Sequence, residues 1–152
     1  MILNTLFDVM RGWPHGSALD ERFTVYAPGG TPVEIIAGSV IYLRSDSTVD
    51  LADGPLAAIA AVPTWVVVEG NDDYSGTFIG KVVALRGTCM LKLDPDNFVA
   101  GAYPVGTLLS FDNGQFKPAT VGLQVIGEVV RDNLLTDTTI DVMYHGGLTK
   151  AL

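Results

Sequence analysis

Short apolar runs, each ended within a few residues by glycine, proline or a polar pair, are the feature that most limits how this chain can fold. The 152 residues include 17 glycines and eight prolines, spread along the whole sequence. Both residue types destabilise helix interiors, proline because it lacks the amide hydrogen and clashes with the preceding turn. Short strands joined by turns fit this spacing. The sequence therefore predicts an all-β protein, a small β-barrel or sandwich.

Several of the runs alternate between apolar and polar residues, whereas Trp65–Val68 is apolar at every position, as expected for a strand with a core on both faces. We expect strands at Phe23–Tyr26, Val33–Ile36, Val40–Arg44, Val49–Leu51, Trp65–Glu69, Gly80–Leu85, Cys89–Leu93, Leu108–Phe111, Ile126–Arg131 and Thr139–Tyr144.

Helix is expected in one or two short segments only. Pro55–Val62 is the better candidate, because proline suits a first helical turn and Pro63 would end the segment. Asn4–Arg11 is the weaker one, with Asn4 as a cap and Gly12 as the end.

The first 22 residues differ from the rest, since they combine large apolar side chains with a Trp13–Ser17 stretch unsuited to regular structure. We therefore divide the chain into an N-terminal arm, residues 1–22, and a β-barrel domain, residues 23–152. Two interpretations stay open for the arm. It covers the barrel, or it docks on another protein.

Two short patterns occur twice in the same order, which suggests an internal repeat. Gly38–Leu43 is echoed by Gly106–Phe111, each strand being followed by a polar turn, and Phe78–Val83 is echoed by Val125–Val130. If the repeat is real, the barrel consists of two similar halves. Common β-strand composition is the alternative explanation.

Charge and composition argue against several classes of partner. The net charge is −8, with 17 acidic and nine basic residues, which is the wrong sign for a phosphate-binding surface, so no nucleic acid is expected. No apolar run approaches the roughly 18 residues of a membrane helix, and no signal peptide is recognisable. The single cysteine, Cys89, is interpreted as a small buried hydrophobe and not as a nucleophile.

No catalytic motif, phosphate-binding loop or zinc spacing is present in the sequence. Asn71–Asp73, Asp94–Asn97 and the carboxylates of Asp46, Asp50 and Asp53 are the only acidic candidates, and turn formation explains residues of these types. We therefore expect neither an enzyme nor a bound metal or cofactor.

The second half resembles the head-decoration proteins of tailed phages, the family that includes the lambda head protein D. Five motifs carry the resemblance, in the family's order, and it extends over residues 33–52 and 80–147. They are Val105–Leu109, Asp112–Gln115, Lys117–Ala119, Val125–Val130 and Ile140–Gly146. The helix-like Leu56–Val62 insert and the long middle segment depart from the simplest family members.

The resemblance implies a β-tulip-like structural protein that forms a homotrimer, binds the major capsid protein on the outer surface of the mature capsid and stabilises contacts between capsid subunits. Such a protein is made in the host bacterial cytoplasm and is found in the virion. Within the arm we expect Leu6, Phe7 and Trp13 to be the capsid-binding residues.

Two other functions were weighed. One is a β-barrel domain of a phage tail or fibre, or a small barrel that binds a ligand or carbohydrate. The other is an enzyme whose site cannot be seen in the sequence.

Overall fold

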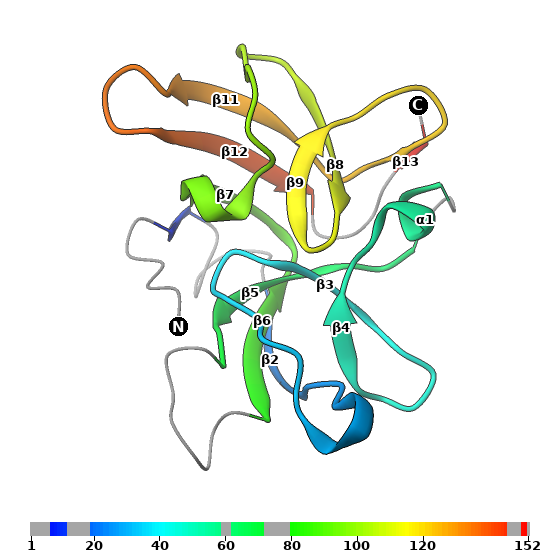
Figure 1. The fold of residues 1–152 in the computed structure, drawn as a ribbon. Coiled ribbons are helices and arrows are strands. Elements are labelled where there is room, and N and C mark those ends of the chain that lie inside the picture. Colours follow the sequence, from blue (N-terminus) through cyan, green and yellow to red (C-terminus); the bar gives the residue numbers. More distant parts are fainter. Residues whose placement is uncertain (1–6, 12–18, 59–61, 72–79, 146–149, 152) are drawn as a thin grey trace.

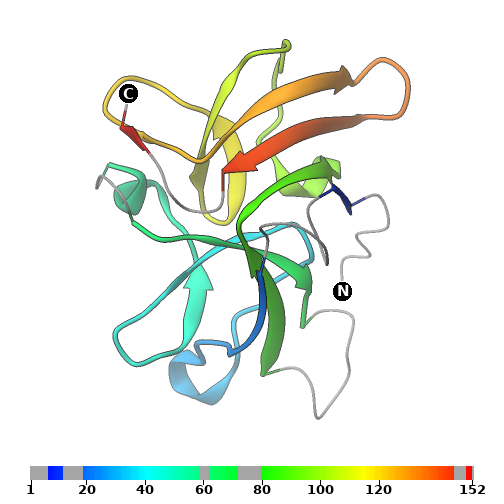
Figure 2. The same cartoon turned by 180° about the vertical axis from the view of Figure 1, so that it is seen from behind.

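The computed structural model describes residues 7–11, 19–58, 62–71, 80–145 and 150–151. It confirms the all-β class: two antiparallel sheets are stacked one above the other, and the described residues contain one short α-helix (Figures 1 and 2). None of the helices in this described part is long and apolar enough to cross a membrane.

The six-stranded sheet has the order β1-β7-β12-β11-β8-β9 and the five-stranded sheet the order β2-β6-β5-β3-β4, while β10 and β13 form a separate pair. The strands are β1 (Asp8–Arg11), β2 (Leu19–Thr24), β3 (Val40–Leu43), β4 (Val49–Leu51), β5 (Trp65–Glu69), β6 (Lys81–Arg86), β7 (Thr88–Leu93), β8 (Leu108–Asp112), β9 (Gln115–Pro118), β10 (Gln124–Val125), β11 (Gly127–Asn133), β12 (Thr139–His145) and β13 (Lys150–Ala151). The helical elements are η1 (Pro28–Gly30), α1 (Gly54–Ala57) and η3 (Pro95–Asn97).

The two sheets are built to one plan. Read from one edge, the strands follow as β4-β3-β5-β6-β2 in the first and β9-β8-β11-β12-β7 in the second. In both, the first and second strands of this order form a hairpin, and the chain then returns to the other side of the hairpin. We call Leu19–Arg86 the N-terminal repeat and Thr88–His145 the C-terminal repeat; β1 is an extra edge strand on the second.

Backbone hydrogen bonds match between the repeats residue by residue. The amide of Gly38 donates to the carbonyl of Val67 (2.7 Å), and that of Gly106 donates to the carbonyl of Val129 (2.8 Å). The two valines also stand at matching bulges, where the β5–β6 and β11–β12 registers shift. Single parallel bridges join Val25 to Val49 and Phe98 to Phe116. The first sequence pattern therefore marks a true structural repeat.

The second sequence pattern does not mark equivalent strands. Its first copy leads into β6, which lies fourth in the order above, whereas its second copy leads into β11, which lies third. The strand equivalent to β11 is β5, because β3 pairs with β5 as β8 pairs with β11. Val-Val pairs are common in buried strands, so this similarity reflects β-strand composition.

Apolar side chains form two core clusters, one on each face of the five-stranded sheet. Val40, Val66 and Leu85 contribute to the larger cluster, which also contains the interior of the C-terminal repeat. Their chain neighbours Ile41 and Val67 point the other way, into the smaller cluster. Because successive residues of a strand face opposite sides, this arrangement explains why β5 is apolar throughout.

Barrel closure stays a prediction. In the N-terminal repeat the chain that follows β2 bridges to β4, at Val25–Val49. In the C-terminal repeat the chain that follows β7 bridges to β9, at Phe98–Phe116. One bridge in each repeat is less than a paired strand, so the architecture that we state is two antiparallel sheets.

Three expectations about local structure need correction. Residues 8–11 form strand β1 and not the end of a helix, because they pair with β7. The helix expected at Pro55–Val62 is shorter: α1 spans Gly54–Ala57, residues 59–61 lie outside the described part, and Val62 is not helical. Residues 33–36 form no strand, since the side chain of Asn71 binds the amide of Ile35 (2.8 Å) and the carbonyl of Val33 (2.8 Å).

Candidate functional site

Of the three residues expected to bind a capsid, the structure describes one. Phe7 is half-buried and packs, with Val9, against the larger core cluster. Leu6 and Trp13 lie outside the described residues. The described parts of the expected arm, residues 7–11 and 19–22, are therefore built into or beside the edge strands β1 and β2. The boundary proposed at Phe23 falls within β2.

The acidic run at Asp94–Asn97 is a structural turn. The Asp94 carboxylate accepts a hydrogen bond from the amide of Asp96 (2.9 Å), and the side chain of Asn97 accepts one from the amide of Asp94 (3.0 Å). This reciprocal pattern caps the short helix η3. Asn71 is likewise occupied with backbone partners, while Asp72 and Asp73 lie outside the described residues.

The other chemical candidates also have structural surroundings. Asp46 accepts from the amide and hydroxyl of Thr48, and Asp53 caps α1 through the amide of Leu56 (3.1 Å). Asp50 lies 3.8 Å from Arg44. Cys89 is buried, as the sequence predicted, and its burial raises the thiol pKa to about 12. A thiol with this pKa carries almost no thiolate at neutral pH.

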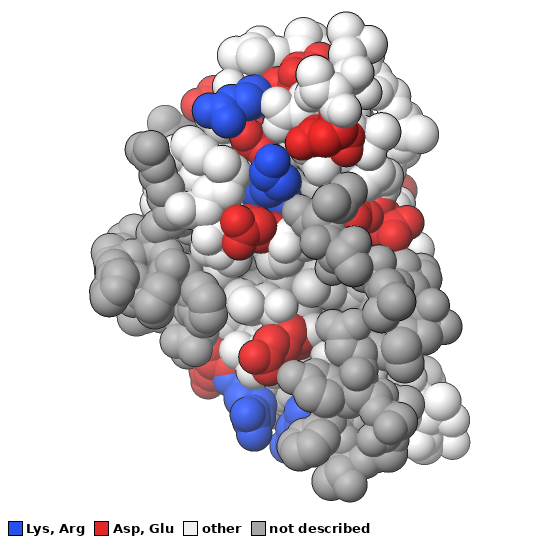
Figure 3. All heavy atoms as spheres, turned by 90° about the vertical axis from the view of Figure 1, so that its left-hand side faces the viewer, with Lys and Arg blue, Asp and Glu red and all other residues white. Residues whose placement is uncertain are grey.

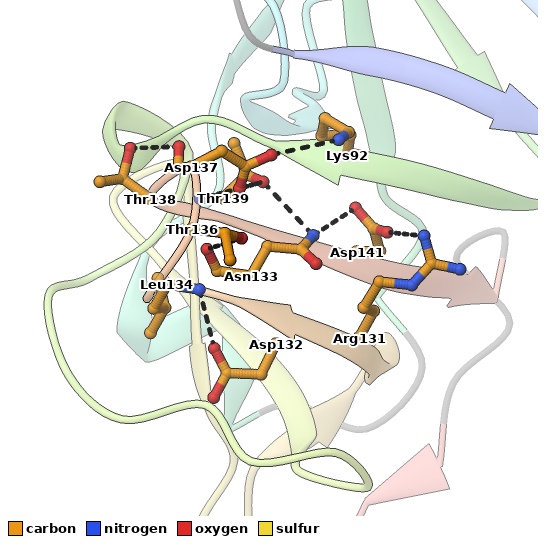
Figure 4. Close-up of polar contacts among 10 residues, drawn as sticks. All are labelled: Lys92, Arg131, Asp132, Asn133, Leu134, Thr136, Asp137, Thr138, Thr139 and Asp141. Atoms are coloured by element: carbon orange, nitrogen blue, oxygen red, sulfur yellow. Dashed lines mark hydrogen bonds and ion pairs between the residues drawn. The ribbon is translucent and has the colours of Figure 1, made fainter.

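A polar network lies at the end of the β11–β12 hairpin (Figure 4). Asp141 is fully buried at its base, where one carboxylate oxygen lies 3.2 Å from the guanidinium of Arg131. That contact is an ion pair without hydrogen-bond geometry. The other oxygen accepts a hydrogen bond from the side-chain Nδ2 of Asn133 (3.2 Å).

Above Asp141, the network continues to the surface. Asp137 accepts hydrogen bonds from the hydroxyl and amide of Thr139 and lies 3.6 Å from Lys92. These contacts, with the Thr139 hydroxyl first, lower the pKa of Asp137. Figure 3 shows acidic and basic atoms interleaved over this face of the molecule. No group of metal-binding side chains occurs among the described residues, and the network is best explained as a brace for the hairpin.

A cleft of about 280 Å³ lies between the two repeats. Its lining comes from Glu34, Ile36, Ser39 and Leu51 of the N-terminal repeat and from Asp96, Asn113, Gly114 and Gln115 of the C-terminal repeat. The β8–β9 turn forms one wall and lies against the start of β3 (Figure 1).

Direct hydrogen bonds between the repeats hold the walls of the cleft. The amide of Val40 donates to the carbonyl of Gly114 (2.8 Å), and the amide of Gly114 donates to the carbonyl of Ala52 (2.8 Å). The side chain of Asn97 donates to the carbonyl of Ala37 (2.8 Å). These hydrogen bonds fix the position of one wall of the cleft relative to the other.

Sequence reasoning did not find this cleft, because its residues come from segments far apart in the chain. The Asp112–Gln115 turn was visible as a turn, and Asp94–Asn97 as an acidic run, but no signal in the sequence brings them beside Glu34 and Ser39. Comparison of the chain with protein-family models, with curated proteins and with solved structures gives no match.

Proposed function

We propose that this protein is a capsid decoration protein, which binds the outer surface of a mature phage capsid as a homotrimer and stabilises contacts between major capsid subunits. The observation that carries the proposal is the placement of the five motifs of the family resemblance. Their described residues lie on β8, β9, β11 and β12 and the turns beside them, and these four strands are neighbours in one sheet.

The distribution of exposed apolar side chains supports the same function. Among the described residues, five of the six large exposed hydrophobic side chains belong to the C-terminal repeat, and Leu43 alone to the N-terminal one. The five are Val99, Val105, Leu108, Val121 and Leu135. The proposal therefore assigns the capsid-facing surface to the C-terminal repeat, which carries most of the large exposed apolar side chains among the described residues.

The experiment is a capsid-binding assay with the full chain and mature capsids of the phage that encodes it. We expect the protein to sediment with the capsids, to saturate at a copy number near that of the major capsid protein, and to be found in purified virions. Cryo-electron microscopy of the decorated capsid would then show trimers. Failure of the protein to bind capsids, or density for isolated monomers or dimers, would contradict the proposal.

The proposed capsid-binding residues of the arm need a sharper test than deletion of residues 1–22, because this deletion would remove β1 and part of β2. We expect Leu6→Ala and Trp13→Ala to weaken capsid binding. Phe7→Ala should lower the unfolding free energy as well, since Phe7 packs on the core. Undiminished capsid binding by Trp13→Ala would exclude the arm as the docking segment.

A further inference from the structure

The cleft between the repeats combines a net negative lining with an apolar floor. Glu34 and Asp96 bring two carboxylates, and no lysine, arginine or histidine is among the residues that line it. Neither carboxylate forms an ion pair with another described residue. Ile36 and Leu51 add apolar surface beside them. Two carboxylates and two aliphatic side chains in the lining of one cleft match a group that is cationic at its tip and aliphatic along its stem.

A second observation points to a ligand independently of the charges. Ser39 lines the cleft and is only 5% exposed as a residue, and no hydrogen bond of its hydroxyl occurs in the described part of the chain. Its oxygen is not one of the buried unpaired atoms of the described residues, so it is accessible from the cleft and can bond an incoming polar group. Its equivalent in the C-terminal repeat, Thr107, is satisfied internally by the carbonyl of Pro104.

The backbone of Asp96 is held in place at the cleft. Asp96 is held by the η3 cap, and its carbonyl accepts a hydrogen bond from the side chain of Gln115 (3.1 Å). Burial and the neighbouring Asp94 raise the pKa of Asp96, an effect that a cation in the cleft would offset.

We propose that the cleft between the two repeats receives a lysine or arginine side chain of a partner protein, with Glu34 and Asp96 as its charge partners and Ser39 as a hydrogen-bond partner. The aliphatic stem lies along Ile36 and Leu51. This inference deepens the proposed function, on which it rests for one point only, the identification of the partner as the major capsid protein.

The first test addresses the cleft alone, with ¹⁵N-labelled full-length protein and N-acetyl-arginine amide or N-acetyl-lysine amide as the probe. We expect saturable shifts of the amide signals of Ser39, Gly114 and Gln115, with a dissociation constant on the order of 10 mM or tighter. N-acetyl-norleucine amide, which has an uncharged side chain, should produce none. The double variant Glu34→Gln/Asp96→Asn should weaken binding about fivefold to tenfold, as the loss of two partly screened charge contacts.

The matched control removes two negative charges elsewhere, at Glu21 and Glu128, for which the structure shows no side-chain partner, and should bind the probes as the natural chain does. Equal shifts with norleucine, or unchanged affinity in Glu34→Gln/Asp96→Asn, would overturn the inference. So would CaCl₂ if it shifted the same signals and competed with the arginine probe, because the cleft would then be a metal site.

The second test uses capsids. Glu34→Gln/Asp96→Asn should bind mature capsids about fivefold to tenfold more weakly than the natural chain, and this difference should shrink at high salt. Equal binding by this variant and the natural chain would contradict the capsid as the source of the basic side chain. If the natural chain does not bind capsids at all, the proposed function fails, while the probe titration still decides the inference about the cleft.

Discussion

The two repeats share one strand order but differ at their corresponding turns. In the N-terminal repeat, the turn at Ala37–Gly38 is covered, because Asn97 of the other repeat donates to the Ala37 carbonyl. In the C-terminal repeat, the corresponding turn at Val105–Gly106 is open, and Val105 is 68% exposed. The shared strand pairings thus determine the fold of each repeat. The side chains that cover a turn determine whether that turn can contact another molecule.

The difference arises from a short insertion. Asp94–Asn97 stands between Leu93, the last residue of β7, and the bridge at Phe98. At the corresponding place in the N-terminal repeat, Thr24 alone stands between Phe23 and the bridge at Val25. The extra residues form η3 and bring Asn97 across to the other repeat. Similar units can therefore acquire different surfaces through a few residues at one strand end.

The largest effect is expected at Gly127, which is equivalent to Trp65 in the other repeat. A Cβ atom at Gly127 would lie 2.5 Å from the carbonyl oxygen of Met143, a backbone atom that cannot turn away. Gly127→Ala should lower the unfolding free energy by about 3 kcal/mol, measured by urea denaturation. Gly101→Ala is the control, since its Cβ would meet only a ring carbon of Tyr103 at 3.9 Å. Equal stability of the two variants would show that β11 and β12 are less closely apposed.

The next effect compares two buried asparagines, Asn71 within the N-terminal repeat and Asn97 between the repeats. Each binds a backbone amide and a backbone carbonyl, so replacement by alanine should cost about 2 kcal/mol in either case. Only Asn97→Ala should also speed hydrogen exchange at the amides of Val40 and Gly114, which join the repeats. Equal acceleration in Asn71→Ala would refute this division of roles.

A smaller difference is expected between the equivalent turn glycines. Gly38 and Gly106 have φ values of +88° and +92°, so alanine is strained at both. A Cβ at Gly38 would also meet the side chain of Asn97 at 2.5 Å, whereas one at Gly106 has open space. Gly38→Ala should therefore be less stable than Gly106→Ala by about 1 kcal/mol in urea unfolding. No difference would mean that Asn97 moves aside without loss.

The smallest effect concerns acid pH and two similar hairpin turns. Asp46 and Asp137 each accept hydrogen bonds from a threonine two residues on, and the threonine hydroxyl is the largest cause that lowers each pKa. A lowered pKa stabilises the folded state above the ordinary carboxyl pKa of about 3.9, and this contribution is lost as pH falls. NMR titration should place both carboxyls below that value. The Asp137→Asn variant should lose less unfolding free energy than the natural chain when the pH is lowered. An ordinary carboxyl pKa at Asp137 in the NMR titration would contradict the hydrogen bonds from Thr139.

Much of the fold could be predicted, because burial on one or both faces of a strand leaves a periodic pattern. Val49–Leu51 and Trp65–Glu69 have the predicted bounds. β1 was mistaken for a helix end, since Phe7, Val9 and Met10 also fit helical spacing and their pairing partner β7 lies far along the chain. The cleft could not be predicted, because it depends on how two sheets are packed and not on any local pattern.

The pairing of β1 with β7 has a consequence for synthesis. Asp8 pairs with Lys92, so β1 waits during synthesis for a partner more than eighty residues behind it. At bacterial and eukaryotic elongation rates, this delay amounts to about 4–16 s. By the end of that interval the N-terminal repeat has all five of its own strands, but the face that joins the larger core has nothing to cover it. A nascent chain stalled near Arg86 should therefore be a strong substrate for ribosome-associated chaperones, and extension through β12 should release it.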